Sequence, residues 1–292
     1  MKVSGFSFIK NALIYDFPIV EAIKSILPIC DEFVVAVGES DDDTLKLITQ
    51  IDPAKIRIVE TQWDESLREG GRVLALETDK AFAQLSEDSD WAFYIQGDEV
   101  VHEKYLDIVY EAMLKYKDDS RVDGLLFKYL HFYGSYDYVG TSSRWYKHEI
   151  RVVRNDKSIY SYRDAQGFRK GNNEKLRVKP IDAYMYHYGW VKEPETMQSK
   201  LENNSKYWHN DQWIDDNIRT EGKTYAFDRH VSELELFEGE HPQVMKERIE
   251  AKNWKFDYDI SRNRKSLKDI FKRILRKVFG IDLAYKNYLI AK

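Results

Sequence analysis

The chain has 292 residues, of which 43% are hydrophobic and 14% aromatic, so it can bury a core without disulfide or metal cross-links. Its single cysteine, Cys30, excludes an internal disulfide, and no stretch is long and apolar enough to cross a bilayer as a helix. The net charge of −5 gives no reason to expect nucleic-acid binding. The N-terminal residues lack the apolar core and cleavage site of a signal peptide, so a cytoplasmic protein is expected.

Strands and helices are predicted to alternate over the first third of the chain. Apolar or β-branched runs of strand length occur at 2–9, 32–38, 55–60 and 91–95. Apolar residues at helical spacing between these runs predict helices at 17–27, 44–51 and 72–85. Such alternation is typical of a three-layer α/β fold with a mostly parallel central sheet.

The middle and end of the chain read differently. Strands are predicted at 125–133 and 149–154, a loop at 134–143, and helical segments at 195–217 and 233–249. In the second of these strands, Arg151 or Arg154 is a candidate for bidentate phosphate binding. For Arg154 a solvated position, or pairing with a surface acid, is favoured.

Two of the predicted strands end in acidic residues. The strand 91–95 is followed by Gln96-Gly97-Asp98-Glu99, and the strand 32–38 by Glu39-Ser40-Asp41-Asp42-Asp43. In open α/β sheets the crevice outside the carboxyl ends of the strands binds ligands, so these acids are expected at one site. A carboxylate there needs a compensating cation, and Asp98 suits Mg²⁺ or Mn²⁺ bound together with phosphate oxygens. The alternative is a turn whose acids cap a helix that begins near residue 102.

The glycine-rich phosphate loops of common nucleotide-binding folds are missing. No GxGxxG follows the first strand, and no GxxxxGK[ST] occurs anywhere in the chain. A dinucleotide-dependent dehydrogenase and a P-loop kinase are therefore disfavoured. The fold class alone does not fix a function.

Several motifs occur in an order that resembles the family-2 glycosyltransferases with a GT-A fold. They are Asn11 after the first strand, SDDDT (40–44) after the second, GGRVLALETDKAFA (70–83), DWAFYIQGDEVV (90–101) and YMYHYGWVKEPETM (184–197). In the family the fourth motif is usually written DxD or DAD, and the fifth is similar to a His-Tyr-Gly-Trp/Tyr-Val segment of many bacterial members. The resemblance covers about residues 1–200.

The resemblance implies a metal site at the end of the fourth strand. Asp98 would coordinate the Mn²⁺ or Mg²⁺ that bridges the donor diphosphate, and His187 would complete the metal or pyrophosphate site. The chain departs from the family at Gln96, where an amide, a poorer metal ligand, replaces the first acid of DxD. Taken by itself, a histidine in an aromatic strand is more often a core residue.

The resemblance also implies a nucleotide site. Asp41, Asp42 or Asp43 would contact the base or the ribose, and Asn11 would belong to the same site. The amide of Gln96 would hydrogen-bond the ribose. The donor would be a nucleotide-diphosphate sugar, with a UDP-sugar favoured.

Inverting sugar transfer also needs a general base near the acceptor hydroxyl, across the anomeric carbon from the departing diphosphate. In the resembling enzymes a carboxylate lies between the strand-four motif and the histidine segment. Asp164, in YRDAQGF, is the candidate, with Glu149 and Glu174 as alternatives. Asp164 could instead serve an Asx turn or a helix cap, and a retaining enzyme would need no such base.

One GT-A-like domain with three parts is expected. These are a nucleotide-sugar-binding half at 1–120, an acceptor-binding half at 121–230, and a helical C-terminal extension at 231–292. In the extension, residues 266–277 (SLKDIFKRILRK) place apolar and basic side chains mainly on opposite faces of a helix. Such a helix favours peripheral contact with the inner face of the cell membrane, worth on the order of 1 kcal/mol per cation. The alternative is a helix that docks its apolar face on the domain.

The expected function is that of a glycosyltransferase, metal-assisted and inverting, that acts in cell-surface polysaccharide synthesis. It would move a sugar to a saccharide or lipid-linked acceptor. One alternative is a catalytically inactive relative that serves as a carbohydrate-binding or assembly subunit, which Gln96 keeps open. A nucleotidyltransferase is less favoured, because it needs a basic, glycine-rich loop where this chain has FIKNALIYD (8–16).

Overall fold

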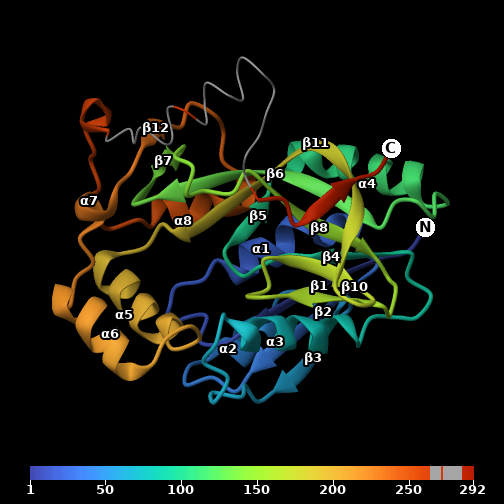
Figure 1. The fold of residues 1–292 in the computed structure, drawn as a ribbon, viewed down its shortest axis with the longest axis horizontal. Coiled ribbons are helices and arrows are strands. Elements are labelled where there is room, and N and C mark those ends of the chain that lie inside the picture. The colour runs from blue at the N-terminus through green and yellow to red at the C-terminus, as the bar shows by residue number, and fades with distance from the viewer. Residues whose placement is uncertain (264–270, 272–284) are drawn as a thin grey trace.

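The parallel part of a central sheet is formed by the first four strands in chain order. The structure, a computed structural model, describes residues 1–263, 271 and 285–292. The four strands are β1 (Val3–Ile9), β2 (Glu32–Gly38), β3 (Ile56–Thr61) and β4 (Trp91–Tyr94). They lie side by side in the order β3-β2-β1-β4, and each neighbouring pair is parallel (Figure 1). The crossovers are α1 (Ile19–Ile26), α2 (Thr44–Thr49) and α3 (Arg72–Phe82).

Side chains of these strands alternate between two packed faces. In β2, Phe33, Val35 and Val37 belong to the core that α1, α2 and α4 (Leu106–Tyr116) cover. Val34 and Ala36 point the other way, into the core under α3. Both faces are buried, which is why the strands read as nearly continuous apolar runs. The strand-helix alternation thus produces the three layers seen in Figure 1.

The second half of the sheet is mixed. An antiparallel strand, β8 (His148–Arg154), separates β4 from β6 (Gly124–Tyr133), and the long β11 (Glu174–Trp190) runs parallel to β6. Shorter strands complete it, namely β5 (Glu99–Val101), β7 (Ser135–Gly140), β9 (Ile159–Tyr162) and β10 (Gly167–Lys170). The expectation of a loop at 134–143 was wrong, because β7 turns back at Gly134 and pairs antiparallel with β6.

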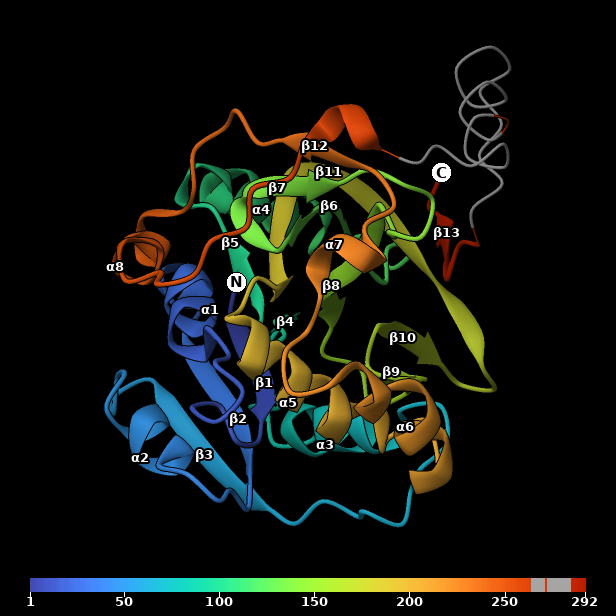
Figure 2. The same ribbon diagram turned by 90° about the vertical axis from the view of Figure 1, so that its left-hand side faces the viewer.

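Short helices follow β11. They are α5 (Pro194–Ser205), α6 (Asp211–Asn217), α7 (Phe227–His230) and α8 (Lys246–Glu250), with short 3₁₀ turns at Leu27–Ile29, Glu103–Tyr105, Arg219–Glu221, Gln243–Met245 and Ile260–Arg262. α5 and α6 lie beside the start of α3 (Figure 2). There the Gly71 amide donates to the Tyr207 carbonyl at 2.9 Å.

The last described segments return to the sheet. β12 (Leu234–Leu236) pairs with β7, and β13 (Tyr288–Ile290) pairs in parallel with residues 176–178 of β11. The described part of 231–292 is therefore integrated into the domain. The predicted basic helix at 266–277 lies outside the described residues, apart from Phe271, so membrane contact through it stays a prediction. None of the helices in the described part is long and apolar enough to span a membrane.

The strand order and crossovers confirm the predicted α/β class with a GT-A-like layout. Parallel strands in the order β3-β2-β1-β4 place the ends of β1, β2 and β4 at one edge of the sheet. The crevice outside this edge is where α/β sheets bind ligands.

Candidate functional site: a cleft at the ends of β1, β2 and β4

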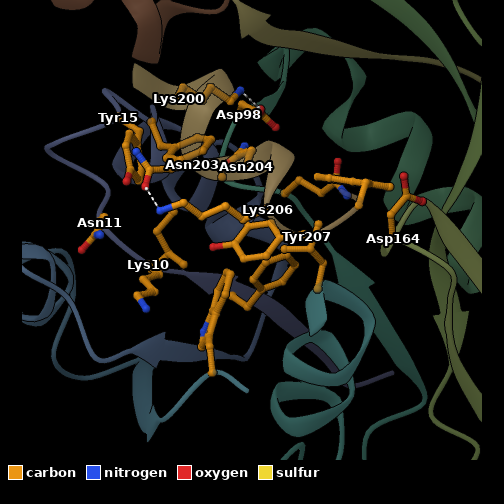
Figure 3. Close-up of a pocket in the computed structure, with 18 of the residues that line it drawn as sticks. Lys10, Asn11, Tyr15, Asp98, Asp164, Lys200, Asn203, Asn204, Lys206 and Tyr207 are labelled. Carbon is orange, nitrogen blue, oxygen red and sulfur yellow. Dashed lines mark hydrogen bonds and ion pairs between the residues drawn. The ribbon is translucent and has the colours of Figure 1, made fainter. Parts of the chain in front are cut away.

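A cleft of about 840 Å³ opens at this edge. One wall comes from the loops that follow β1, β2 and β4, and the opposite wall from α5 and the residues after it (Figure 3). Of the predicted site residues, the structure brings five together in the cleft: Asn11, Asp41, Gln96, Asp98 and Asp164. Asp42, Asp43 and His187 do not line it.

Asn11 and Asp41 form one corner of the cleft. The Asn11 side chain donates from Nδ2 to Asp41 Oδ2 at 3.1 Å, and its Oδ1 accepts from the Asp41 amide at 2.8 Å. Asn11 has a positive φ of 53°, a conformation that asparagine tolerates better than most residues. The pair fixes the loop after β1 to the loop after β2 and leaves Asp41 Oδ1 for a ligand donor.

The other two acids of SDDDT have structural positions. Asp42 accepts from the amides of Leu13 and Ile14 at 2.9 and 2.8 Å, and also from Thr44. Asp43 precedes α2 and points to solvent, with Lys46 at 3.8 Å. Asp41 is therefore the acid of this motif that faces the cleft.

The two acids after β4 have different partners. Glu99 is fully buried, and Arg151 holds both of its carboxylate oxygens at 2.7 Å. The alternative in which Glu99 caps a helix was therefore wrong, as was phosphate binding by Arg151. Arg154 was also misread as solvated or paired with an acid, because its guanidinium donates to backbone carbonyls such as Val122 O at 2.9 Å.

Asp98 faces the cleft and is surrounded by positive charge. Lys200 Nζ on α5 lies 3.2 Å from Asp98 Oδ2, and His187 Nε2 lies 3.8 Å from Asp98 Oδ1. Burial acts to raise the pKa of Asp98, but its neighbours, above all the Lys200 ammonium and then His187 and Lys192, outweigh burial and hold the pKa well below its usual range. Asp98 is therefore ionised at neutral pH.

His187 lies behind Asp98 in β11. Its Nδ1 is 3.2 Å from His131 Nδ1, so one of these two nitrogens carries the hydrogen. Burial lowers the pKa of His187, and the neighbouring Asp98 opposes that change. The neutral imidazole is thus a second contact for Asp98 rather than part of the cleft wall.

The side chains around Asp98 fit a divalent cation poorly. Asp98 supplies one carboxylate, Glu99 is held by Arg151, and the nearest cation is the Lys200 ammonium. Across the described ranges, no group of three or more His, Cys, Asp or Glu side chains is arranged to hold a metal ion. Mg²⁺ and Mn²⁺ prefer several oxygen ligands. The Mn²⁺ or Mg²⁺ site at Asp98 stays a prediction, and the residues present favour a different partner for this carboxylate.

Asp164 lies on a tight turn between β9 and β10. Its neighbours Arg163 and Ala165 have positive φ values of 58° and 62°. Gln96 Nε2 donates to the Ala165 carbonyl at 3.1 Å, so the residue that departs from DxD holds the Asp164 turn against the end of β4. Burial raises the pKa of Asp164. This carboxylate is therefore a stronger base than an exposed aspartate.

The alternative bases are less well placed. Glu149 is buried on β8 and accepts from Gln166 Nε2 at 3.0 Å, but it does not line the cleft. Glu174 is exposed at the β10–β11 turn and also lies outside the cleft lining. Of the three candidates, Asp164 alone lines the cleft.

The opposite wall carries residues that the motif analysis missed. Lys200, Asn203 and Asn204 are spaced three and four residues apart on α5, so they share one helix face toward the cleft. Lys206 and Tyr207 follow directly and also line it (Figure 3). The spacing after the histidine segment was the signal, since it puts a lysine and two amides on one face of a helix that begins at Pro194.

Two glycines, Gly189 and Gly71, allow the backbone to pass close to Asp98 and to Asp164. A Cβ at Gly189 would lie 2.6 Å from Asp98 Oδ2 and 2.7 Å from the His187 ring. A Cβ at Gly71, whose φ is +67°, would lie 2.5 Å from Asp164 Cβ and 2.8 Å from the Trp208 ring. Close contact at both ends of the cleft therefore requires residues without a side chain.

Comparison with known proteins gives structural neighbours only. No protein-family model matches the chain. No curated protein matches it either.

Three solved structures illustrate the similarity. The crystal structure of S. aureus TarS matches with a TM-score of 0.42 and 16% sequence identity, and the match covers 70% of this chain and 39% of TarS. Mycobacterium tuberculosis glucosyl-3-phosphoglycerate synthase, with Mn²⁺, UDP and phosphoglyceric acid, has a TM-score of 0.29 at 20% identity, over 44% and 43%. Anaerococcus prevotii 4-diphosphocytidyl-2C-methyl-D-erythritol synthase has a TM-score of 0.39 at 13% identity, over 70% and 97%. The match thus spans well under half of TarS, and the activity of this chain rests on its own side chains.

Proposed function

We propose that the chain is a glycosyltransferase that takes a sugar from a nucleoside-diphosphate donor and passes it to a saccharide or lipid-linked acceptor. The observation that carries the proposal is the cleft, where a corner with hydrogen-bond acceptors (Asn11, Asp41), a cationic wall (Lys200, Lys206) and a partly buried carboxylate (Asp164) meet. Each part matches one need of the reaction, namely to bind the nucleoside, neutralise the diphosphate and deprotonate the acceptor.

The nucleoside is assigned to the corner at the ends of β1 and β2. Asp41 Oδ1 is an acceptor for an imide N–H, which uracil and thymine carry at N3. Trp63 and Tyr207 both line the cleft, with ring centroids 5.6 Å apart, and offer aromatic faces for a base. These features favour a UDP-sugar.

The diphosphate is assigned to the α5 wall. When the bond between the sugar and the diphosphate breaks, negative charge grows on the leaving oxygen, and a fixed cation stabilises it. Lys200 is held in place by Asp98 and the Gly189 carbonyl, and Lys206 Nζ by Asn203 Oδ1 at 3.2 Å. Both ammonium groups are therefore ordered before a donor arrives.

Asp164 is proposed as the general base. The acceptor hydroxyl loses its proton to the carboxylate as its oxygen bonds to the anomeric carbon, and the bond to the diphosphate breaks. The nucleoside diphosphate leaves with the bonding electron pair. In this arrangement the attacked face is opposite the leaving group, so the anomeric configuration inverts. The proposed place of the reaction is cell-surface polysaccharide synthesis.

Binding and turnover test the proposal separately. Calorimetry with UDP, GDP and dTDP is expected to show binding, tightest for UDP. Hydrolysis of a panel of UDP-sugars then measures slow transfer to water. Failure of all three nucleotides to bind, with and without added metal, would contradict the proposal. Release of the diphosphate from a UDP-sugar also separates a transferase from a carbohydrate-binding subunit, and a nucleotidyltransferase would instead release pyrophosphate from UTP.

Asp164→Asn tests the base. The amide cannot accept the proton, so turnover is expected to fall by roughly a hundredfold or more while the UDP Kd stays unchanged. Because burial raises the pKa of Asp164, the native rate is expected to decline on the acid side at a pH above that of an exposed aspartate. Asp182→Asn, at an exposed position on β11, is the control. Native turnover in the Asp164→Asn variant would remove Asp164 from the mechanism.

A further inference from the structure

We propose that the ammonium group of Lys200 does the work of a divalent cation, so that donor binding and transfer need no metal. In the free protein the ammonium group balances the negative charge of Asp98, and in the complex it also balances negative charge on the donor diphosphate. The inference rests on the proposed function and adds to it the way in which the leaving group is neutralised.

Lys200 is built into the site. Its side chain is 11% exposed, and Nζ lies 3.2 Å from Asp98 Oδ2 and 2.9 Å from the Gly189 carbonyl. Nζ also lies 4.8 Å from the centroid of the Phe17 ring, within reach of a cation–π contact. An ammonium group has three donors, and two are used here, which leaves the third for a phosphate oxygen. Figure 3 shows the Lys200–Asp98 contact at the edge of the cleft.

Few oxygen ligands remain for a metal beside Asp98. Glu99 has both oxygens on Arg151 in the core. Gln96 donates its amide nitrogen to the Ala165 carbonyl, so only its amide oxygen, a poorer ligand than a carboxylate, is left. A metal would therefore meet one carboxylate and one amide, with an ammonium group 3.2 Å from the carboxylate Oδ2. A divalent ion at that oxygen would meet strong like-charge repulsion from Lys200.

A second buried cation strengthens the argument. Lys192 is fully buried, and its Nζ donates to the Asp16 carbonyl and lies 4.8 Å from the same Phe17 ring. Burial, together with the charge of Lys200, lowers the pKa of Lys192 to about 7. Lys192 is therefore only partly charged at neutral pH, and the negative charge of a bound diphosphate would favour its protonation, whereas a further cation would oppose it.

Asp98 then has a positioning role. Its carboxylate holds the Lys200 side chain at the cleft, where the ammonium can share its hydrogen bonds between Asp98 and an incoming phosphate oxygen. The metal interpretation and this one differ in what they predict for Asp98→Asn. A metal ligand would lose metal-dependent binding, whereas a partner of Lys200 leaves the cation present and frees it for the phosphate.

The test is calorimetry of UDP with full-length protein that has been treated with EDTA, then repeated with added Mn²⁺ and Mg²⁺. Binding is expected without metal, and added metal is expected to change the Kd by less than about twofold. Lys200→Met is expected to weaken UDP binding roughly ten- to a hundredfold, since it removes a charge-assisted contact. Lys200→Arg keeps the charge and is expected to retain most of the affinity.

Controls separate folding from function. Lys157→Met removes an exposed lysine that pairs with Glu87 outside the cleft lining, and native affinity is expected. Thermal unfolding shows whether the Lys200→Met protein is folded. If it is not, UDP binding to Asp98→Asn is measured in EDTA instead. Retained binding supports the metal-free role of Lys200, and lost binding contradicts it. UDP binding only with Mn²⁺ or Mg²⁺, or unchanged binding in a folded Lys200→Met protein, would overturn the Lys200 role and keep the transferase. No nucleotide binding under any condition would overturn both.

Discussion

The two adjacent acids after β4, Asp98 and Glu99, have different surroundings and different roles. Glu99 forms a fully buried ion pair with Arg151, in which both carboxylate oxygens are held. Removing either partner of such a pair would leave an uncompensated charge in the core. Asp98, one position earlier, faces the cleft with Lys200. One acid therefore stabilises the fold and the other belongs to the site.

The sequence alone could place Asp98 and Asp41 at the edge of the sheet, but it could not assign the partners of Asp98 and Glu99. Both acids follow apolar strands, so their position at the edge of the sheet follows from local patterns. The partners come from far along the chain, since Arg151 is 52 residues from Glu99 and Lys200 is 102 from Asp98. No spacing rule connects such pairs. The metal prediction rests on the motif and on the resemblance, neither of which shows that a lysine lies beside Asp98.

At the residue scale, Glu149 gives a prediction for the pH dependence of stability. Burial raises its pKa to about 8 from an ordinary 4.5, and Oε2 has no hydrogen-bond partner among the described residues. The folded state therefore holds a proton that the unfolded state loses above pH 4.5, so Glu149 lowers stability progressively as pH rises from there to about 8. In Glu149→Gln, this loss between about pH 5 and pH 8 is expected to shrink by on the order of 3 kcal/mol.

Denaturant unfolding at several pH values measures the Glu149 effect. The quantity to compare is the change in the free energy of unfolding between about pH 5 and pH 8 in each protein. A pH-independent cost of the new amide cancels in that difference. Glu174→Gln, at an exposed site, is expected to leave the native pH profile unchanged. The same slope in the native protein and in Glu149→Gln would contradict the assignment.

At the scale of elements, the cleft depends on α5 reaching the loop before α3. The Tyr207 carbonyl after α5 accepts from the Gly71 amide, and Arg68 Nε donates to the Lys206 carbonyl at 3.1 Å. The helix itself was predictable from its pattern. Its docking was not, because it depends on backbone contacts between segments far apart in the chain. The missed β7 has a similar cause, since a polar and aromatic run becomes a strand only beside β6.

Gly71→Ala tests this contact. The new Cβ would collide with Asp164 Cβ at 2.5 Å and with the Trp208 ring at 2.8 Å, so the Asp164 turn or the segment after α5 has to shift. Turnover is expected to fall at least tenfold, since small displacements of a positioned base are costly. Gly70→Ala is the matched control, because Gly70 also has a positive φ, +58°, but nothing lies within 4 Å of its Cβ position.

Both glycine variants should lose about 1 kcal/mol of stability through backbone strain. Thermal unfolding measures that shared cost, and UDP-sugar hydrolysis measures the difference. Equal activity in Gly70→Ala and Gly71→Ala would show that the Asp164 turn does not depend on this contact.

At the scale of the whole molecule, the sheet connects segments from both ends of the chain. The parallel half was predictable, because each strand follows its helix in order. The mixed half was harder, since β8 inserts between β4 and β6 and the order no longer follows the chain. The pairing of β13 with β11 was not foreseen, because three residues carry too little pattern to specify a partner.

Removing residues 288–292 tests the contribution of β13. The deletion eliminates the pairing with residues 176–178 and the hydrogen bond from the Ala291 amide to the Val178 carbonyl at 2.9 Å. Stability is expected to fall by about 1–3 kcal/mol, because backbone pairing is lost while Leu289 and Ile290 bury little surface. UDP affinity is expected to stay native, since Gly189 lies at the other end of β11.

Calorimetric melting and UDP titration of the truncated protein check both expectations. Leu289→Ser, a change at an exposed side chain of the same strand, is the control for composition. A loss of UDP affinity in the truncated protein, at a temperature where it is folded, would mean that β13 influences the cleft.

The late pairing of β13 has a consequence for biosynthesis. Residues 176–178 leave the ribosome before residues 288–290, so this edge of β11 has open amide and carbonyl groups until the later segment emerges. An uncovered edge invites pairing with other nascent chains. Slower elongation or low temperature during expression would prolong that interval, and a chaperone that shields β-edges would act on this edge before residues 288–290 emerge.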